Sequence, residues 1–391
     1  MFEKKYDLVV CGGGVAGVAA ALAAARRNLK TCLIEKSIQP GGLATGGLVL
    51  IYLPLCNGMG KQVTFGISEE LLRASIKYGP DDIPENWNTE GVHPQNERFR
   101  TYFSPAGFVL AMDELIAAAG IDVWYDTVIT GVERSGRNID AVNVFNKSGH
   151  GRITGGTFID ATGDSDVAFM AELPCLEATN ALVTWAIEHR EAEASSSYSF
   201  GTHTYVKIKQ QPLDTKYTAP GIDGRMVSDF VQASRKFYLE DMLADHTSGK
   251  ETRYTRYPLY LPGIPPLRHT RCIKGRSILQ PGQENRSCAD SIGLAADWRC
   301  AGKVWEIPWS TMLPEDVDNL IAAGRCTSAS DDAWEITRVI PAAAMTGEVA
   351  GVAAALAHCK QSSAGTLTYH AIVAELQRNN HFPVKLSEVG L

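Results

Sequence analysis

The sequence has no pair of cysteines spaced as Cys-x-x-Cys, although it contains nine cysteines. An odd number of cysteines without paired spacing argues against a disulfide framework and predicts reduced, mostly buried thiols in a cytoplasmic protein. The histidines and cysteines are not clustered at the spacing of a zinc site. Asp160, Asp164 and Asp166 have a spacing that a metal ion accepts, but a capped turn explains these carboxylates better. We therefore expect no metal.

A long hydrophobic run is also missing. The apolar stretch 15–25 is about half as long as a membrane span and ends at Arg26 and Arg27. A cluster of glycines stands where the apolar core of a leader peptide belongs, so we expect neither a secretion signal nor a membrane partner. Positive charge is not in excess, because 37 Lys and Arg residues face 44 Asp and Glu residues, for a net charge of −7. This balance disfavours nucleic acid as the main partner but is compatible with a local basic pocket for a small acid.

Internal repeats and low-complexity segments are absent as well. The composition, 45% hydrophobic and 21% charged, is that of a globular protein. The 391 residues exceed the length at which a single hydrophobic core stops growing, so we expect more than one domain.

The first 36 residues carry the clearest pattern. Residues 6–11 form a short apolar stretch typical of a strand that is covered on both faces of a parallel sheet. A Gly-x-Gly-x-x-Gly motif, an alanine-rich helix and a second strand at 31–34 follow, and Glu35 comes directly after that strand. This order predicts a dinucleotide-binding unit, in which the acidic residue binds a ribose hydroxyl.

Each glycine of the motif has a physical task. Gly12 allows the tight turn, Gly14 lets the backbone approach a pyrophosphate, and Gly17 lets the helix pack closely on the strand. The free N–H groups and the dipole of the helix then face the phosphates. A second glycine-rich segment at 41–47 is either a flexible loop or a backbone that lies against a flat cofactor.

The rest of the chain suggests an interrupted domain. Strands are expected at 121–125, 139–146 and 151–159, and the last of them runs into a turn of small residues at 160–166. Residues 171–300 change character, whereas 301–391 return to buried strand and small-residue helix patterns, with Pro341 in the first turn of a long helix. The sequence therefore predicts an α/β fold: a Rossmann-like domain made of 1–170 and 301–391, with a parallel sheet and a β-meander, and an inserted α+β substrate or cap domain at 171–300.

Several of these segments together resemble a known family. The segments are 7–17, 34–36, 41–42, 159–166, 319–325 and 338–341. They resemble the FAD-dependent oxidoreductase family, within the glutathione-reductase-like flavoproteins and distantly akin to fumarate reductase flavoprotein subunits. The resemblance covers the first ~170 and the last ~90 residues. It also includes the segment 268–271, whereas the rest of the middle matches poorly.

The resemblance implies FAD as the cofactor. It implies that the glycine motif holds the pyrophosphate, Glu35 the adenosine ribose, Val128 the adenine through its backbone, and the helix after Pro341 the pyrimidine side of the flavin. A positive dipole end there favours the reduced flavin. The expected FAD-binding residues are Gly12, Gly14, Val15, Ala16, Gly17, Glu35, Lys36, Gly41, Gly42, Val128, Ala161, Thr162, Gly163, Asp166, Gly324, Arg325, Ala343 and Ala344.

The candidates for catalysis are fewer. Arg338 and Arg271 are expected to anchor a substrate carboxylate, because a guanidinium grips it bidentately and stays charged when partly buried. Arg338 has an alternative role, in which it pairs with Asp331 or Asp332 and closes a loop. His203 lies among small residues and is a candidate proton donor, with a structural role as its alternative. Cys56 is a candidate for a link to the flavin, although burial in apolar packing explains it better.

The sequence contains no second strand–glycine–helix unit and no redox Cys-x-x-Cys. Within the resemblance, this favours direct electron exchange between the flavin and a bound substrate. We expect an FAD-dependent enzyme that transfers a hydride between the flavin and a small polar metabolite, anionic or neutral, that binds under the cap domain. The alternative is a flavoprotein that works through a macromolecular partner, in electron transfer or RNA modification. A homo-oligomer is compatible with either.

Overall fold

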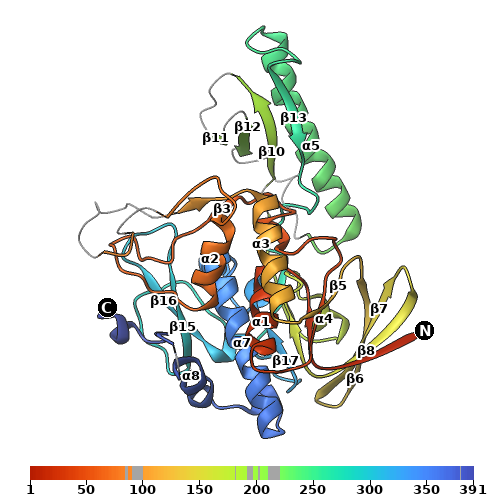
Figure 1. Cartoon of the computed structure of the whole chain (residues 1–391), viewed down its shortest axis with the longest axis vertical. Helices are drawn as coiled ribbons and strands as arrows, with labels where there is room; N and C mark the ends of the chain where they lie inside the picture. Colours follow the sequence, from red (N-terminus) through yellow and green to blue (C-terminus); the bar gives the residue numbers. More distant parts are fainter. Residues whose placement is uncertain are drawn as a thin grey trace. The chain divides into compact units, whose positions relative to one another are not determined.

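The computed structural model divides the chain into two compact units (Figure 1). The first unit consists of Met1–Thr45, Leu50–Leu176 and Arg271–Leu391, and the second consists of Gly46–Val49 and Glu177–Thr270. The structure describes residues 1–83, 87–89, 100–180, 182–191, 197–200, 203–209, 221–378 and 380–391. Strands β11 and β12 are described by their backbone alone.

A seven-stranded sheet forms the centre of the first unit. Its order is β5 (Asp122–Trp124), β2 (Thr31–Ile34), β1 (Phe2–Cys11), β8 (Gly149–Asp160), β7 (Asn138–Asn146) and β6 (Val128–Ser135), and β17 (Leu320–Ala322) also pairs with β8. The pairs among β5, β2, β1, β8 and β17 are parallel, whereas β8, β7 and β6 form an antiparallel meander. The predicted α/β fold with a parallel sheet and a β-meander is confirmed.

Helices and short strand pairs complete the first unit. The helices are α1 (Val15–Ala25), α2 (Ile67–Ile76), α3 (Pro105–Ala118), α4 (Asp166–Met170), α6 (Asp331–Thr337), α7 (Ile340–Lys360) and α8 (Tyr369–Gln377). The strand pairs are β3 (Ile51–Tyr52) with β4 (Thr101–Tyr102), β9 (Cys175–Glu177) with β14 (Arg271–Ile273), and β15 (Ser291–Ala296) with β16 (Val304–Pro308).

Four parallel strands of the sheet end in line. Cys11 is in register with both Ile34 and Asp160, and Asp160 is in register with Ala322. The loops after β1, β2, β8 and β17 therefore leave the sheet at the same edge, which is where open α/β sheets bind ligands.

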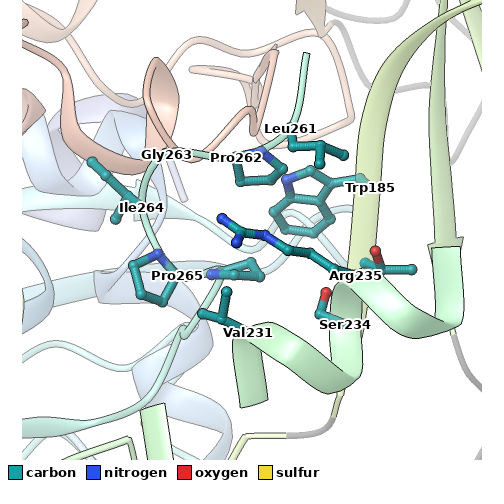
Figure 2. A pocket seen from close by; sticks show the side chains of 11 residues that line it. Trp185, Val231, Ser234, Arg235, Leu261, Pro262, Gly263, Ile264 and Pro265 are labelled. Carbon is teal, nitrogen blue, oxygen red and sulfur yellow. The ribbon is translucent and has the colours of Figure 1, made fainter. Parts of the chain in front are cut away.

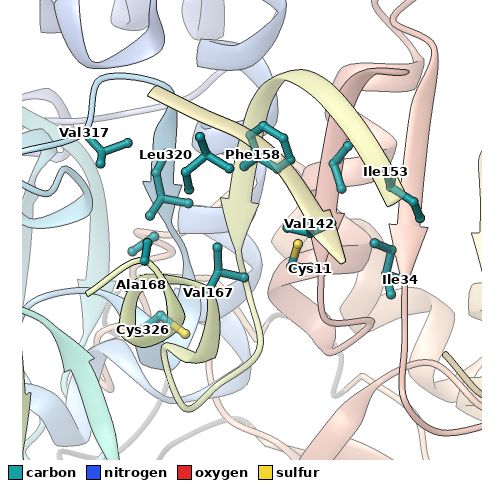
Figure 3. Close-up of a cluster of buried hydrophobic side chains, with 14 of the residues drawn as sticks. Cys11, Ile34, Val142, Ile153, Phe158, Val167, Ala168, Val317, Leu320 and Cys326 are labelled. Atoms are coloured by element: carbon teal, nitrogen blue, oxygen red, sulfur yellow. The ribbon is translucent and has the colours of Figure 1, made fainter. Parts of the chain in front are cut away.

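A hydrophobic core packs α4 against the sheet near the antiparallel meander (Figure 3). Phe158 and Leu320 come from adjacent strands, and Val167 and Ala168 come from α4. All four side chains are fully buried. The core therefore holds α4, and with it the turn at the end of β8, against the sheet.

Helices α1 and α7 pack at the closest distance that a backbone permits. A Cβ at Gly347 would lie 2.1 Å from the carbonyl oxygen of Ala16, and a Cβ at Gly351 would lie 2.3 Å from that of Ala20. Both contacts advance by four residues in the same direction, so the two helices run parallel and their N-termini lie at the same end. The absence of a side chain at both glycines is therefore what allows this close approach.

The second unit is a four-stranded antiparallel sheet with one long helix. The strand order is β11 (Ser197–Phe200), β12 (His203–Lys209), β10 (Val183–Arg190) and β13 (Arg256–Tyr260), and the helix is α5 (Gly224–Thr247). The fully buried Arg256 forms ion pairs with Glu188 of β10 and with Asp241 and Asp245 of α5. These pairs connect the helix to the sheet.

Two details differ from the sequence analysis. Residues 271–300 group with the first unit rather than with the inserted domain, because β14 pairs with β9 and β15 pairs with β16. The sequence also suggests Ser68 as the cap of a helix over 67–77, but Ser68 lies inside α2, which begins after Gly66. Its hydroxyl instead donates to the carbonyl oxygen of Pro341, 3.0 Å away.

Among the described residues, one helix is long and apolar enough to cross a membrane. This helix is α7, and 94% of its apolar 18-residue stretch is buried inside the protein.

The close packing of α1 and α7 predicts a steric effect. Gly347→Ala should lower the free energy of unfolding by about 1–3 kcal/mol, because the added methyl group overlaps the Ala16 carbonyl. Gly107→Ala in α3 is the matched control, since its Cβ would meet its nearest neighbour at an ordinary 3.4 Å. Urea unfolding followed by circular dichroism measures both. Equal stability of the two variants would contradict the packing argument.

The α2–α7 contact predicts a pH effect. The buried carboxylate of Glu348 in α7 accepts from the backbone N–H of Ile67 at 2.6 Å, and burial raises its pKa to about 7. A raised pKa means that the folded chain binds a proton more tightly than the unfolded chain, so this group costs stability as the pH rises through 7. Glu348→Gln should therefore gain stability relative to the natural chain at pH 8 but not at pH 5. A stability difference independent of pH would contradict this assignment.

Candidate functional site

The glycine motif forms a turn that only glycine can make. Gly12 has a φ of +103°, and a Cβ there would lie 2.4 Å from the carbonyl oxygen of Ala161. A Cβ at Gly17 would lie 1.8 Å from the carbonyl oxygen of Gly12. The first contact brings the loops after β1 and β8 together, and the second brings the start of α1 against the turn.

Gly14 is different, because the space beside it is open. Apart from its neighbours along the chain, no atom of the described residues lies within 4 Å of the position that its Cβ would take. Gly14 precedes the first turn of α1, and no side chain caps that helix. The loop after β2 lies next to it, since the N–H of Gly41 donates to the carbonyl oxygen of Gly13 at 2.8 Å. An open space at an uncapped helix N-terminus between two glycine loops fits a pyrophosphate.

Glu35 lies at the end of β2 and is buried. One carboxylate oxygen accepts from the N–H of Gly13 and the other from the N–H of Ser37, each at 2.7 Å. A carboxylate accepts about four hydrogen bonds, so two positions remain for a ribose diol. The N–H of Thr127 donates to the carbonyl oxygen of Glu35, which places the start of β6 at Val128 beside this residue.

The turn after β8 is built on Asp160. Its buried carboxylate accepts from the N–H and hydroxyl groups of Thr162 and from the N–H of Ala168. Burial raises the pKa of Asp160 to about 6 in spite of these bonds. The sulfur of Cys326 accepts from the N–H of Gly163 at 3.2 Å and from that of Ser165 at 3.4 Å. The sequence analysis did not identify Cys326, because nothing local to it indicates a contact 163 residues away.

Two arginines bind the same turn. Arg325 pairs with the carboxylate of Asp164 at 2.8 Å. Arg271 donates to the carbonyl oxygen of Asp164 at 3.1 Å and pairs with Asp166 at 2.9 Å. Burial raises the pKa of Asp166, against the opposing charges of Lys36 and Arg271. Arg271 is thus committed to the turn, and its guanidinium also lies 3.9 Å from the centre of the Phe169 ring.

The loop after β17 meets the N-termini of both glycine-packed helices. Gly324 has a φ of +63°, and a Cβ there would lie 2.8 Å from the Cβ of Ala16 and 3.4 Å from that of Ala343. Its N–H donates to the hydroxyl of Thr346 at 2.9 Å. The structure therefore brings together residues that the sequence analysis placed at one cofactor, from α1, α7 and the β17 loop. Thr346 was missed, since a hydroxyl inside a helix gives no sequence signal.

Arg338 lies between α6 and α7 and is mostly buried, with 11% of its side chain exposed. It pairs with Glu335, and not with Asp331 or Asp332 as the loop-closing alternative requires. Burial lowers the pKa of its guanidinium. Within the described part of the chain, its Nε atom has no hydrogen-bond partner. The N-terminus of α7 next to it has no side-chain cap.

His203 begins β12, where its backbone is in register with His189. Its side chain lies outside the described part of the structure.

The comparison with known protein families agrees with this geometry. Residues 7–183 and 282–378 match the family described as FAD dependent oxidoreductase. The chain belongs to this family. FAD is therefore its cofactor, as predicted, and the two matched segments leave out most of the second unit.

Individual relatives match shorter stretches. A thioredoxin reductase of Ureaplasma parvum is 33% identical over 76 residues, which are 19% of this chain and 25% of the relative. A digeranylgeranylglycerophospholipid reductase of Picrophilus torridus is 31% identical over 153 residues, 37% of this chain and 36% of the relative. The chain thus matches only a quarter to a third of the length of these relatives.

A solved structure supports the fold. The aromatic hydroxylase CabE, from angucycline biosynthesis, superposes with a TM-score of 0.54 at 11% identity, over 94% of this chain and 65% of that one. At this identity the likeness concerns the FAD-dependent oxidoreductase fold alone.

A covalent link from this oxidoreductase to its flavin finds no support at Cys56. The thiol is buried and donates to the carbonyl oxygen of Trp87 at 3.4 Å. Burial raises its pKa to about 12, so the reactive thiolate is disfavoured. Apolar packing, the alternative from the sequence analysis, fits this environment.

The carboxylates considered for a metal have other partners. Asp160 accepts from backbone N–H groups, Asp164 pairs with Arg325, and Asp166 pairs with Arg271. In the ranges that the structure describes, no group of three potential ligands is arranged around one point.

The position of Glu35 predicts weaker FAD binding when its charge is removed. Glu35→Gln keeps the shape of the side chain but removes the negative charge that accepts from Gly13 and that is predicted to accept from a ribose hydroxyl. A hydrogen bond to a charged group contributes about 1.5–3 kcal/mol, so the Kd for FAD should rise about 10- to 100-fold. Flavin fluorescence during titration of the apoprotein measures this. Glu133→Gln, at a half-buried pair with Arg152, is the control. An unchanged Kd for Glu35→Gln would contradict the assignment.

Proposed function

We propose that this chain transfers a hydride between FAD and a small polar, anionic metabolite that the second unit helps to bind. The observation that carries this proposal is the buried guanidinium of Arg338, with an unpartnered Nε next to the uncapped N-terminus of α7. A guanidinium and a helix N-terminus both favour an anion.

The cofactor residues follow from the geometry of the strand ends. The open space at Gly14 would take the pyrophosphate, with Val15, Ala16 and Gly17 at the helix N-terminus, and Glu35 would take the ribose. Bound FAD supplies the two-electron chemistry, and the chain supplies position and charge. The turn at 161–166, the loop at 41–42 and residues 324–325 and 343–344 would line the remainder, because they meet at the same edge of the sheet.

Arg338 is the better of the two arginine candidates for anchoring a substrate. Arg271 is engaged by Asp164 and Asp166, so its substitution would disturb the turn itself. Arg338 has one carboxylate partner, Glu335, and a second donor position free within the described residues. We assign Arg271 to positioning the turn and Arg338 to the anion.

The second unit is proposed to act as the substrate domain. The family match leaves out residues 184–281, which lie mostly in this unit. Segments outside a shared cofactor scaffold are where substrate identity usually resides. His203, on β12, is retained as a candidate proton donor. The kinship with glutathione-reductase-like flavoproteins and fumarate reductase subunits rests on the shared motifs alone.

An enzyme for a small metabolite and a flavoprotein that needs a macromolecular partner should differ in how their flavin absorbance responds to small molecules alone. Purified protein is titrated with small organic acids and with small-molecule reductants in the absence of any other protein. Bleaching or reoxidation of the flavin absorbance under these conditions supports the enzyme. Flavin that responds only when a protein or RNA is added supports the alternative.

The anchor assignment predicts the effect of a conservative change. Arg338→Lys should leave the FAD content normal but lower turnover by about two orders of magnitude, because the lysine cannot form the bidentate contact. Arg299→Lys is the control, since Arg299 pairs with Asp332 at the same helix. Turnover is measured with an acid that reacts in the flavin assay. Unchanged turnover, or equal losses in both variants, would remove support for the anchor.

A further inference from the structure

The second unit contains a pocket that the cofactor site does not use (Figure 2). It lies between β10, α5 and the loop 261–266, and its volume is about 150 Å³. Its lining residues are Thr184, Trp185, Val231, Ser234, Arg235 and 261–266. The walls are thus an indole, aliphatic side chains and three prolines, with one charged side chain.

The polar atoms at the base of the pocket are already satisfied. The indole N–H of Trp185 donates to the carbonyl oxygen of Gly47 at 2.7 Å, and the Trp185 side chain is buried. The hydroxyl of Ser234 donates to the carbonyl oxygen of Val183 at 2.8 Å. These bonds fix two walls of the pocket and direct both polar atoms away from a ligand.

Arg235 is the exception. In Figure 2 its side chain extends from α5 between Trp185 and the proline loop. Among the described residues, no hydrogen bond or ion pair to its guanidinium is found, and none of the lining residues is acidic. Two other cations of the same helix have such partners: Arg225 pairs with Asp229, and Lys236 with Glu240. The residue four positions after Arg235 is Leu239, which offers no charge.

A second cation reinforces the positive potential. The guanidinium of Arg268 lies 5.1 Å from the centre of the Trp185 ring. A cation over an indole adds to the field at that wall without occupying the pocket. An anion beside Arg235 therefore meets no negative lining residue, and the indole that forms one wall carries a second cation, Arg268.

The volume limits the ligand. A cavity of 150 Å³ accepts a molecule of about the size of benzene. The apolar walls favour a flat or branched hydrocarbon body, and the single free guanidinium favours one carboxylate.

We propose that this pocket binds a small organic carboxylate with a body of about one ring, held by Arg235 at the carboxylate and by Trp185 and the prolines at the body. This binding is independent of the function proposed above, in which Arg338 holds the substrate anion. The proline loop is fixed within the second unit, because the N–H of Gly263 donates to the carbonyl oxygen of Gly46 at 2.9 Å.

Benzoate is the probe, and benzamide is its neutral counterpart. Titration calorimetry on the full-length, FAD-loaded protein should show benzoate binding at least 10-fold more tightly than benzamide. Arg235→Gln should weaken benzoate binding about 10- to 100-fold and leave benzamide unchanged. Arg235→Lys should fall between, because it keeps the charge but not the fork. Lys236→Gln, on the same helix, should bind benzoate as the natural chain does.

Two results would overturn the inference: no heat of benzoate binding up to tens of millimolar, or equal affinity in Arg235→Gln and the natural chain. Arg235 is exposed and is not part of the core, and an unchanged melting temperature confirms that each variant is folded. The FAD content of every sample is measured separately. A change in flavin content is thereby separated from a change in benzoate binding, and loss of the Arg235 dependence counts against this pocket.

Discussion

The cofactor site depends on the register of four parallel strands. Because Cys11, Ile34, Asp160 and Ala322 lie side by side at one edge of the sheet, the loops that follow them meet without long excursions of the chain. A shift of one residue in any pair would turn its terminal side chain to the opposite face. The burial of Asp160 and the contact between the Gly12 and Ala161 loops both require the observed register.

The second constraint is the contact between α1 and α7. Backbone touches backbone at Gly347 and Gly351, which fixes the two helices as a parallel pair. Their uncapped N-termini then add at one end, next to Gly324. Two positive helix ends at one place repel each other unless an anion lies between them. The pyrophosphate of FAD, the cofactor of this family, is such an anion.

Local features of this site could be predicted from the sequence, and non-local ones could not. The turn at Gly12, the strand before it and Glu35 depend on neighbours within about thirty residues, so their spacing alone indicates a dinucleotide. Cys326 and Thr346 depend on contacts across the sheet and were missed. Residues 271–300 group with the first unit through the pairs β14–β9 and β15–β16, and the pairing of β14 with β9, far earlier in the chain, has no local signal in the sequence.

The number of partners of each buried or pocket arginine distinguishes a role in the fold from a role in ligand binding. Arg256 and Arg271 each bind two or more carboxylate or carbonyl oxygens, so their positive charge stabilises the fold. Arg338 has one carboxylate partner and an unpartnered Nε, and Arg235 has no hydrogen-bond or ion-pair partner among the described residues. A charged guanidinium with an unsatisfied donor gains most from an incoming anion. Both positions therefore select the same chemical class of ligand, from different parts of the chain, which is why a carboxylate is the common element of the two proposals.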